Sequence, residues 1–219
     1  MIKTVVILLS ILTSTVSKGY SKMETINTDN ILYSMPTISG NKITYVMPTR
    51  KSFTNAPQFH EDEWCQLQFF HKSQLEDIKS ILIEYKKFEL SHRRKYGWSD
   101  IYVRKVNIDN IHVSMVELTQ ILSTKTTPPP ILTTSSKPLG QVKDGFSLRT
   151  KSGVLLYGIE SNGKIKSLCS ILESNTDNIS LTKVFNKLNR EKNLILVDWR
   201  QQFILVSVDS KDNINIWNP

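Results

Sequence analysis

The chain has 219 residues, of which 39% are hydrophobic and 22% are charged, and its formal net charge is +8. This balance excludes an intrinsically disordered chain and suits one large domain or two small ones, at roughly 100–200 residues each. The sequence holds only 8 Gly residues and has no P-loop, G-x-G-x-x-G or G-x-S-x-G motif, which excludes the phosphate-binding loops and the nucleophile elbow that those motifs build.

Residues 1–17 have the pattern of a secretory signal peptide. Lys3 supplies the positive n-region, residues 4–16 carry no charge, and Thr15 and Ser17 are small enough for the −3 and −1 positions of a cleavage site. An uncleaved anchor or a buried strand are the alternatives, but the apolar run is shorter than the ~20 residues of a membrane-spanning helix. We therefore expect a periplasmic or secreted protein that does not span a membrane after cleavage.

The chain after the expected cleavage point begins with a polar stretch. Residues 18–56 are rich in Ser, Thr, Asn and Lys, which predicts a weakly ordered N-terminal segment with one short strand over residues 43–47. A first α+β half is expected over residues 57–123. Its predicted elements are a strand over 64–70, a helix over 73–95, strands over 98–106 and 108–113, and a short helix over 114–122.

The two helices of this half carry start signals. In the helix over 73–95, apolar side chains recur at helical spacing, and Ser73 and Glu76 match a capping box. Ser114 and Glu117 match the same motif at the short helix. We expect each pair to satisfy backbone donors in the first helical turn.

Residues 124–140 contain four Pro among several Thr and Ser residues. Such a segment favours an extended polyproline II conformation, so we expect it to link two halves. A second α+β half is expected over residues 141–219, with a hairpin turn at Asn162 and Gly163. Its predicted elements are strands over 146–150, 154–159 and 165–172, a helix ending near residue 190 after a polar cap at 175–178, and strands over 194–197, 203–206 and 214–217.

These elements predict an α+β fold with a mostly antiparallel sheet and two main amphipathic helices packed on one side. The two halves share the order strand, helix, strand, strand. Residues 98–104 align with 199–205, and residues 109–113 align with 212–216. An internal duplication would explain this likeness, and so would coincidence between Ile-rich and Asn-rich strands.

The chain has only two cysteines, Cys65 and Cys169. In an oxidising compartment they could pair and tie the two halves together. The alternative is two buried free thiols, because both residues lie in apolar, strand-like runs.

Two segments combine cations with aromatic side chains, as binding hot spots do. The first is the His-Arg-Arg-Lys-Tyr-Gly-Trp run at residues 92–98, and the second is Trp199 with Arg200 after a predicted strand. The alternatives are a helix end whose dipole favours positive charge, a surface salt bridge and core tryptophans. The candidate binding residues are Arg93, Arg94, Lys95, Tyr96, Trp98, Trp199 and Arg200.

No metal or cofactor site is expected. His60 and Cys65 are five residues apart and lack a second pair at zinc-ligand spacing, although His71 lies nearby. A hydrolase built on separated carboxylates is a further alternative, with the candidates Glu61, Asp62, Glu63 and Asp198.

The pattern as a whole indicates an exported, non-enzymatic protein-binding module. Its basic surface favours an acidic protein partner, for example a toxin neutralised by a periplasmic immunity or inhibitor protein. An envelope-associated protein that binds anionic lipid or polysaccharide is the second hypothesis, and the exported hydrolase is the third. Export makes nucleic acid an unexpected partner.

Overall fold

The structure is a computed structural model that describes residues 32–108, 111–172 and 177–219. These residues form mixed α+β structure in which most strand pairs are antiparallel, so the expected fold class is confirmed. The expected signal peptide and the start of the expected weakly ordered segment lie outside the described residues.

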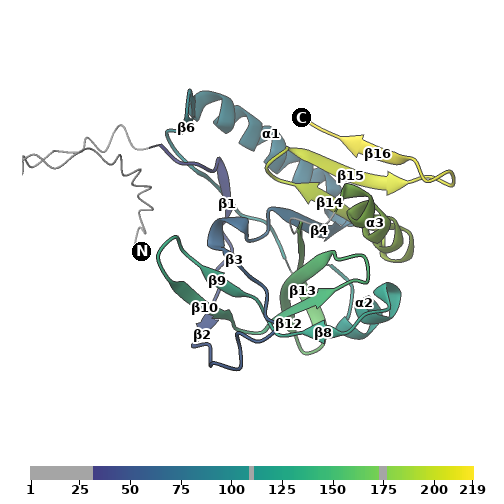
Figure 1. The fold of residues 1–219 in the computed structure, drawn as a ribbon. Coiled ribbons are helices and arrows are strands. Elements are labelled where there is room, and N and C mark those ends of the chain that lie inside the picture. Colours follow the sequence, from purple (N-terminus) through teal and green to yellow (C-terminus); the bar gives the residue numbers. More distant parts are fainter. Residues whose placement is uncertain (1–31, 109–110, 173–176) are drawn as a thin grey trace, which may run out of the picture. The chain divides into compact units, whose positions relative to one another are not determined.

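An eight-stranded sheet forms the centre of the described chain (Figure 1). Every neighbouring pair in it is antiparallel. The strands lie in the order β16 (Ile214–Trp217), β15 (Phe203–Val208), β14 (Leu194–Asp198), β4 (Leu67–His71), β13 (Lys164–Ile171), β12 (Leu155–Ser161), β11 (Gly145–Arg149) and β8 (Thr126–Thr127).

The strands predicted for the second half are confirmed, and so is the turn between β12 and β13. Asn162 has a φ of 52° and Gly163 a φ of 73°. Two successive left-handed residues match the twist of a two-residue hairpin, and Asn-Gly adopts them at low cost. The turn sets the pairing of Glu160 with Ile165, and a bulge between Ile159 and Glu160 then shifts the register by one residue, so that Tyr157 faces Cys169 on the neighbouring strand.

The helices α1 (Leu75–His92) and α3 (Asn178–Lys192) cover opposite faces of this sheet. Neighbouring residues of a strand point to opposite faces, and Phe69 packs with α3 while Phe70 packs with α1. The expectation that both helices lie on one side is therefore wrong. The reason is that β14 is apolar at consecutive positions, so both of its faces need a cover.

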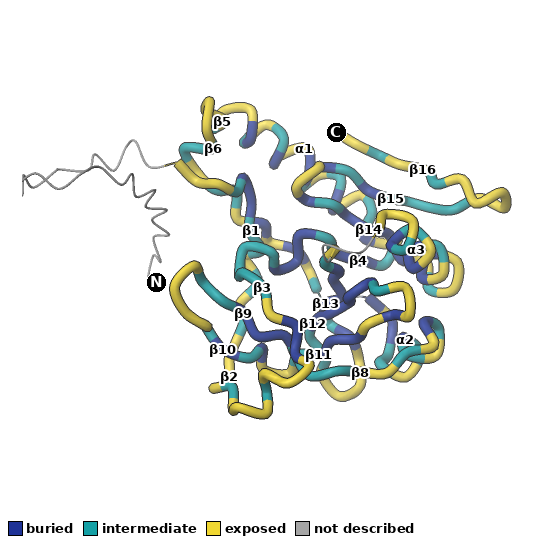
Figure 2. The backbone as a smooth tube through the Cα atoms, in the orientation of Figure 1, coloured by how far each residue is buried: buried dark blue, intermediate teal, exposed yellow. Residues whose placement is uncertain are grey.

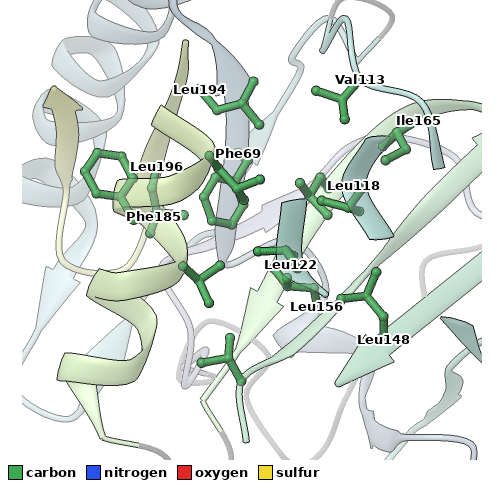
Figure 3. Packing of buried hydrophobic residues seen from close by; sticks show 14 of the residues in the cluster. Phe69, Val113, Leu118, Leu122, Leu148, Leu156, Ile165, Phe185, Leu194 and Leu196 are labelled. Atoms are coloured by element: carbon green, nitrogen blue, oxygen red, sulfur yellow. The ribbon is translucent and has the colours of Figure 1, made fainter. Parts of the chain in front are cut away.

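The face beneath α3 holds the largest hydrophobic cluster, which Figure 3 shows from close by. Phe185 of α3 meets Leu196 of β14 there, and α2 (Met115–Leu122) contributes Leu118. The capping box at Ser114 and Glu117 is confirmed, since both of its hydrogen bonds form.

The start and end of α1 differ from the prediction. Ser73 lies within a 3-10 turn, Lys72–Gln74, and its N–H donates to the imidazole of His71 at 3.3 Å. The capping box with Glu76 is therefore wrong, because α1 begins at Leu75 and the strand before it supplies the acceptor. The helix ends at His92, and the chain turns back at once.

Two smaller sheets pack on the face of the eight-stranded sheet that α1 covers. One has the order β2 (Tyr45–Val46), β10 (Pro138–Val142), β9 (Ile131–Thr133) and β3 (Gln58–His60), and the other pairs β1 (Thr37–Ser39) with β7 (Tyr102–Arg104) in parallel.

The expected linker is part of this structure. Residues 124–140 supply β8, β9 and the first residues of β10, and Ile131 and Leu132 are fully buried. The prolines precede β9 or begin β10, so β9 still pairs with β3 on one side and β10 on the other. Residues 32–219 accordingly form one compact unit, not two linked halves.

The two expected halves also differ in topology. After α3, the strands β14, β15 and β16 join the eight-stranded sheet in succession. After α1, β7 pairs with β1 outside that sheet. This difference favours coincidence over duplication as the source of the likeness in sequence.

Candidate functional site

The predicted basic-aromatic segment forms a tight β-hairpin directly after α1. Its strands are β5 (Arg93–Arg94) and β6 (Gly97–Trp98), and Lys95 and Tyr96 form the two-residue turn between them. Residues 93–96 of this hairpin are exposed, and Gly97 and Trp98 are partly buried (Figure 2).

The base of the hairpin is fixed by a buried carboxylate. Glu89 is 5% exposed and accepts from the Arg93 guanidinium at 2.8 Å and from the Trp98 indole at 3.4 Å. Gln202, from the turn after β14, donates to its other oxygen at 3.5 Å. Arg93 and Trp98 therefore hold the hairpin to α1, and their side chains serve the fold.

A second contact anchors the hairpin from the other side. The backbones of Trp98 and Tyr33 exchange two hydrogen bonds, of 2.8 and 3.0 Å. A Cβ at Gly97 would lie 2.5 Å from the carbonyl oxygen of Tyr33. Glycine is therefore required here by the close approach of another backbone.

The hairpin tip, Arg94, Lys95 and Tyr96, is free of these anchoring contacts. Tyr96 is 78% exposed, and the Lys95 ammonium lies 4.9 Å from the centre of its ring. Among the described residues, the Arg94 guanidinium donates to backbone carbonyls alone, those of Arg93 and of Ser91 at the end of α1. Among the described residues, no carboxylate forms an ion pair with Arg94 or Lys95.

One face of α1 carries exposed apolar side chains. Ile83 is 41% exposed and Leu90 is 66% exposed, and with Lys87 they recur at i, i+4 and i+7 on one helical face. On this face of α1, the helix that leads into the hairpin, a cationic side chain thus lies between two apolar ones. Such a mixture is typical of protein-binding surfaces.

The second predicted binding segment does not form a surface site. Trp199 is fully buried and packs edge-on against Phe70 at 6.2 Å, so its expected role as a contact residue is wrong. Arg200 is paired with Glu63, and Asp198 accepts from the Gln201 N–H at 2.8 Å. Burial raises the pKa of Asp198, against the effect of these backbone hydrogen bonds. These groups close the turn between β14 and β15.

A buried polar layer lies on the face of the sheet that α1 covers. Tyr157, Cys169, Gln68 and Val197 stand opposite one another on four adjacent strands. Val197 belongs to the hydrophobic cluster under α1, whereas Tyr157 and Cys169 belong to the cluster under the four-stranded sheet of β2, β10, β9 and β3. The polar groups therefore mark the boundary between two hydrophobic clusters.

Arg104 is the cation of this layer and is 1% exposed. Its guanidinium donates to Thr37 Oγ1 at 3.0 Å, to Gln66 Oε1 at 3.4 Å and to the Cys65 carbonyl at 3.0 Å. It also lies 4.9 Å from the centre of the Trp199 ring. Burial lowers the pKa of Arg104 to about 10. Within the described residues it has no carboxylate partner, so neutral acceptors and an aromatic face replace the ion pair.

The two cysteines meet beside Arg104. Cys65 and Cys169 are free thiols whose sulfur atoms lie 3.0 Å apart, and both also contact the Ser167 hydroxyl. The Cys65 N–H donates to the Tyr157 hydroxyl at 2.9 Å. Each of the expected alternatives, pairing and burial, thus has a basis in the structure.

Arg104 is not among the residues predicted from the sequence, although the chain carries a signal for it. In β7, Tyr102 and Arg104 point the same way and the intervening Val103 is 50% exposed. Alternation with Tyr102 on the inner side places a cation at an inward position. An inward cation within a strand indicates a buried polar contact.

The residues considered for metal binding and hydrolysis lie in separate places. His60 Nδ1 is 3.3 Å from Asp62 Oδ2, whereas Cys65 faces Cys169 in the interior. Burial, followed by the charge of Asp62, raises the pKa of Glu61. In the part of the chain that the structure describes, no three His, Cys, Asp or Glu side chains gather as a metal site would require.

The chain matches no family model, no curated protein and no solved structure. None of the described helices has the length and apolar composition that crossing a bilayer requires.

Proposed function

We propose that the protein is an exported, non-enzymatic binding module that docks an acidic protein surface through the hairpin tip. The observation that carries this proposal is the exposure of Arg94, Lys95 and Tyr96 on a hairpin whose base is anchored by other residues. A rigid base limits the entropy that binding would cost, and Arg and Tyr are enriched in interface hot spots.

The charge of the chain supports an acidic partner. The net charge is +8, and the two cations of the hairpin tip have no ion pair with a described residue. Unpaired cations steer an acidic surface toward the tip. An immunity or inhibitor protein that covers the acidic face of a toxin fits this arrangement.

The test replaces the tip without touching its base. The full chain, tagged at the C-terminus, is expressed in its native host, and the protein that co-purifies with it is isolated for affinity measurements. We expect the triple variant Arg94→Ala, Lys95→Ala, Tyr96→Ala to bind that protein at least about tenfold more weakly, because truncated hot-spot residues typically cost 1–2 kcal/mol or more.

The chain offers a matched control at a distant sequence position. Arg50, Lys51 and Phe53 are also exposed, and their triple alanine variant removes the same charge and one aromatic ring. Unchanged affinity of the tip variant, or a loss confined to the Arg50 variant, would refute the proposed surface. Tip-dependent binding to vesicles of anionic phospholipid, with no protein partner, would favour the lipid hypothesis.

A further inference from the structure

We propose that Cys65 and Cys169 close into a disulfide by exchange with a disulfide oxidant, and that Tyr157 positions Cys65 for this reaction. Both cysteines are buried, and neither belongs to the proposed binding surface. A disulfide between them is one of the two alternatives that the sequence leaves open.

The geometry of the two thiols supports the formation of a disulfide. Their sulfur atoms are 3.0 Å apart, and the two residues are 2% and 0% exposed. Cys169 lies within β13, a strand paired on both sides, so its backbone is fixed. Two side chains from distant parts of the chain thus bring their sulfurs into contact with no third thiol nearby, since the chain has only 2 Cys.

The backbone of Cys65 supports the positioning role of Tyr157. Cys65 has a φ of 57°, in the left-handed region that residues with a Cβ seldom adopt. Its N–H donates to the Tyr157 hydroxyl at 2.9 Å, and its carbonyl accepts from Arg104 at 3.0 Å. Tyr157 in turn donates to the Glu63 carbonyl at 3.1 Å. Side chains therefore hold both polar groups of this residue, as expected where surrounding structure maintains a strained conformation.

The chemistry needs one external disulfide, such as oxidised glutathione. One cysteine, as the thiolate, attacks a sulfur of that disulfide, and the first small thiolate leaves. The second cysteine, also as the thiolate, attacks the protein sulfur of the mixed disulfide, and the second small thiolate leaves. Two protein thiols are oxidised, one disulfide is reduced to two thiols, and the two protons pass to the departing thiolates.

Burial determines when this exchange occurs. It raises the pKa of the Cys169 thiol well above its ordinary value, so little Cys169 thiolate is present in the folded chain. An oxidant also has no direct path to sulfurs that are this deeply buried. We therefore expect the bond to form while the chain folds and to resist reduction afterwards.

The first experiment uses the unaltered full chain. It is unfolded and reduced, refolded in a buffer of reduced and oxidised glutathione, quenched with acid, and alkylated under denaturing conditions before mass spectrometry. A chain that has lost two hydrogen atoms and takes up no alkyl group carries the Cys65–Cys169 bond. We expect this species to dominate and its Tm to fall by roughly 10 °C on reduction. Two alkylated thiols, or two glutathione adducts, would overturn the proposal.

The second experiment isolates the role of Tyr157. We expect Tyr157→Phe to lower the equilibrium constant for disulfide formation with glutathione at least about tenfold, because poorly placed cysteines form strained, easily reduced bonds. Tyr85→Phe is the control, since Tyr85 is equally buried and makes no hydrogen bond to Cys65. Equal constants for the two variants would remove the positioning role, and the mass measurement on the unaltered chain tests the bond whether or not either variant folds.

Discussion

At the scale of single residues, two buried tyrosines show how differently one hydroxyl can act. Tyr85 and Tyr157 are both fully buried. The Tyr157 hydroxyl makes two hydrogen bonds to backbone groups, whereas that of Tyr85 has no partner of normal geometry among the described residues. Burial raises the pKa of Tyr85 to about 12, against the effect of the nearby Gln202 amide. The same substitution at the two sites therefore removes different interactions.

We expect Tyr157→Phe to lower the free energy of unfolding by about 1–3 kcal/mol, because it leaves the buried Cys65 N–H without its acceptor. It also removes one of two hydrogen bonds to the Glu63 carbonyl, which still accepts from the Gln66 N–H at 3.4 Å. Tyr85→Phe should change that free energy by less than about 1 kcal/mol, or raise it, because it removes a hydroxyl that burial penalises. Urea denaturation of both variants at neutral pH measures the difference. Equal losses would mean that the Tyr85 hydroxyl has a partner in solution, such as a buried water.

At the scale of elements, one carboxylate ties two helices together. Glu117 accepts from the N–H and the hydroxyl of Ser114 at the start of α2, and it pairs with Lys192 at the end of α3. The hydrogen bond from Lys192, and then those from Ser114, lower the pKa of Glu117 from 4.5 to about 2. A carboxyl whose pKa is lower in the folded state stabilises it above the unfolded pKa and loses that effect as the pH falls through the folded value.

We expect Glu117→Gln to have a lower Tm than the unaltered chain at pH 7, and this gap to narrow as the pH falls from about 4.5 to about 2. Thermal unfolding followed by circular dichroism across this range measures it. Glu76→Gln is the matched control, because Glu76 is also a first-turn acid paired with a lysine, Lys79, and lies exposed on α1. A gap that stays constant down to pH 2 would show that the charge of Glu117 is not its source.

The elements that could be predicted from the sequence are those whose signals are local. The apolar run over residues 194–197 and the Asn162-Gly163 turn carry their own pattern, and the structure confirms both. The prediction of a linker over residues 124–140 is wrong because β9 pairs with β3, which lies far earlier in the chain at Gln58–His60, and no local pattern shows that partner. The candidate site, too, could be predicted only in its local features. The sequence indicated a basic, aromatic segment, but only the fold shows that buried Glu89 takes up Arg93 and Trp98.

At the scale of the whole described chain, β4 joins what the sequence presents as two halves. It comes early in the chain, yet it lies between β13 and β14 of the second half. Phe69 and Phe70 pack on its two faces in different hydrophobic clusters. Without β4, the eight-stranded sheet would divide into two parts, each with an open edge at its most buried strand. The second half therefore depends on the first for its core.

We expect a fragment of residues 124–219 to lack a cooperative unfolding transition, because it has neither β4 nor the helices α1 and α2 that cover the sheet. Mixing it with a fragment of residues 32–123 should restore near-ultraviolet circular dichroism and a single transition, since β4 can then insert between its two partners. Each fragment alone is the control for the mixture. A sharp transition in the 124–219 fragment alone would show that its strands close into a stable sheet by themselves, and that the first half only adds to it.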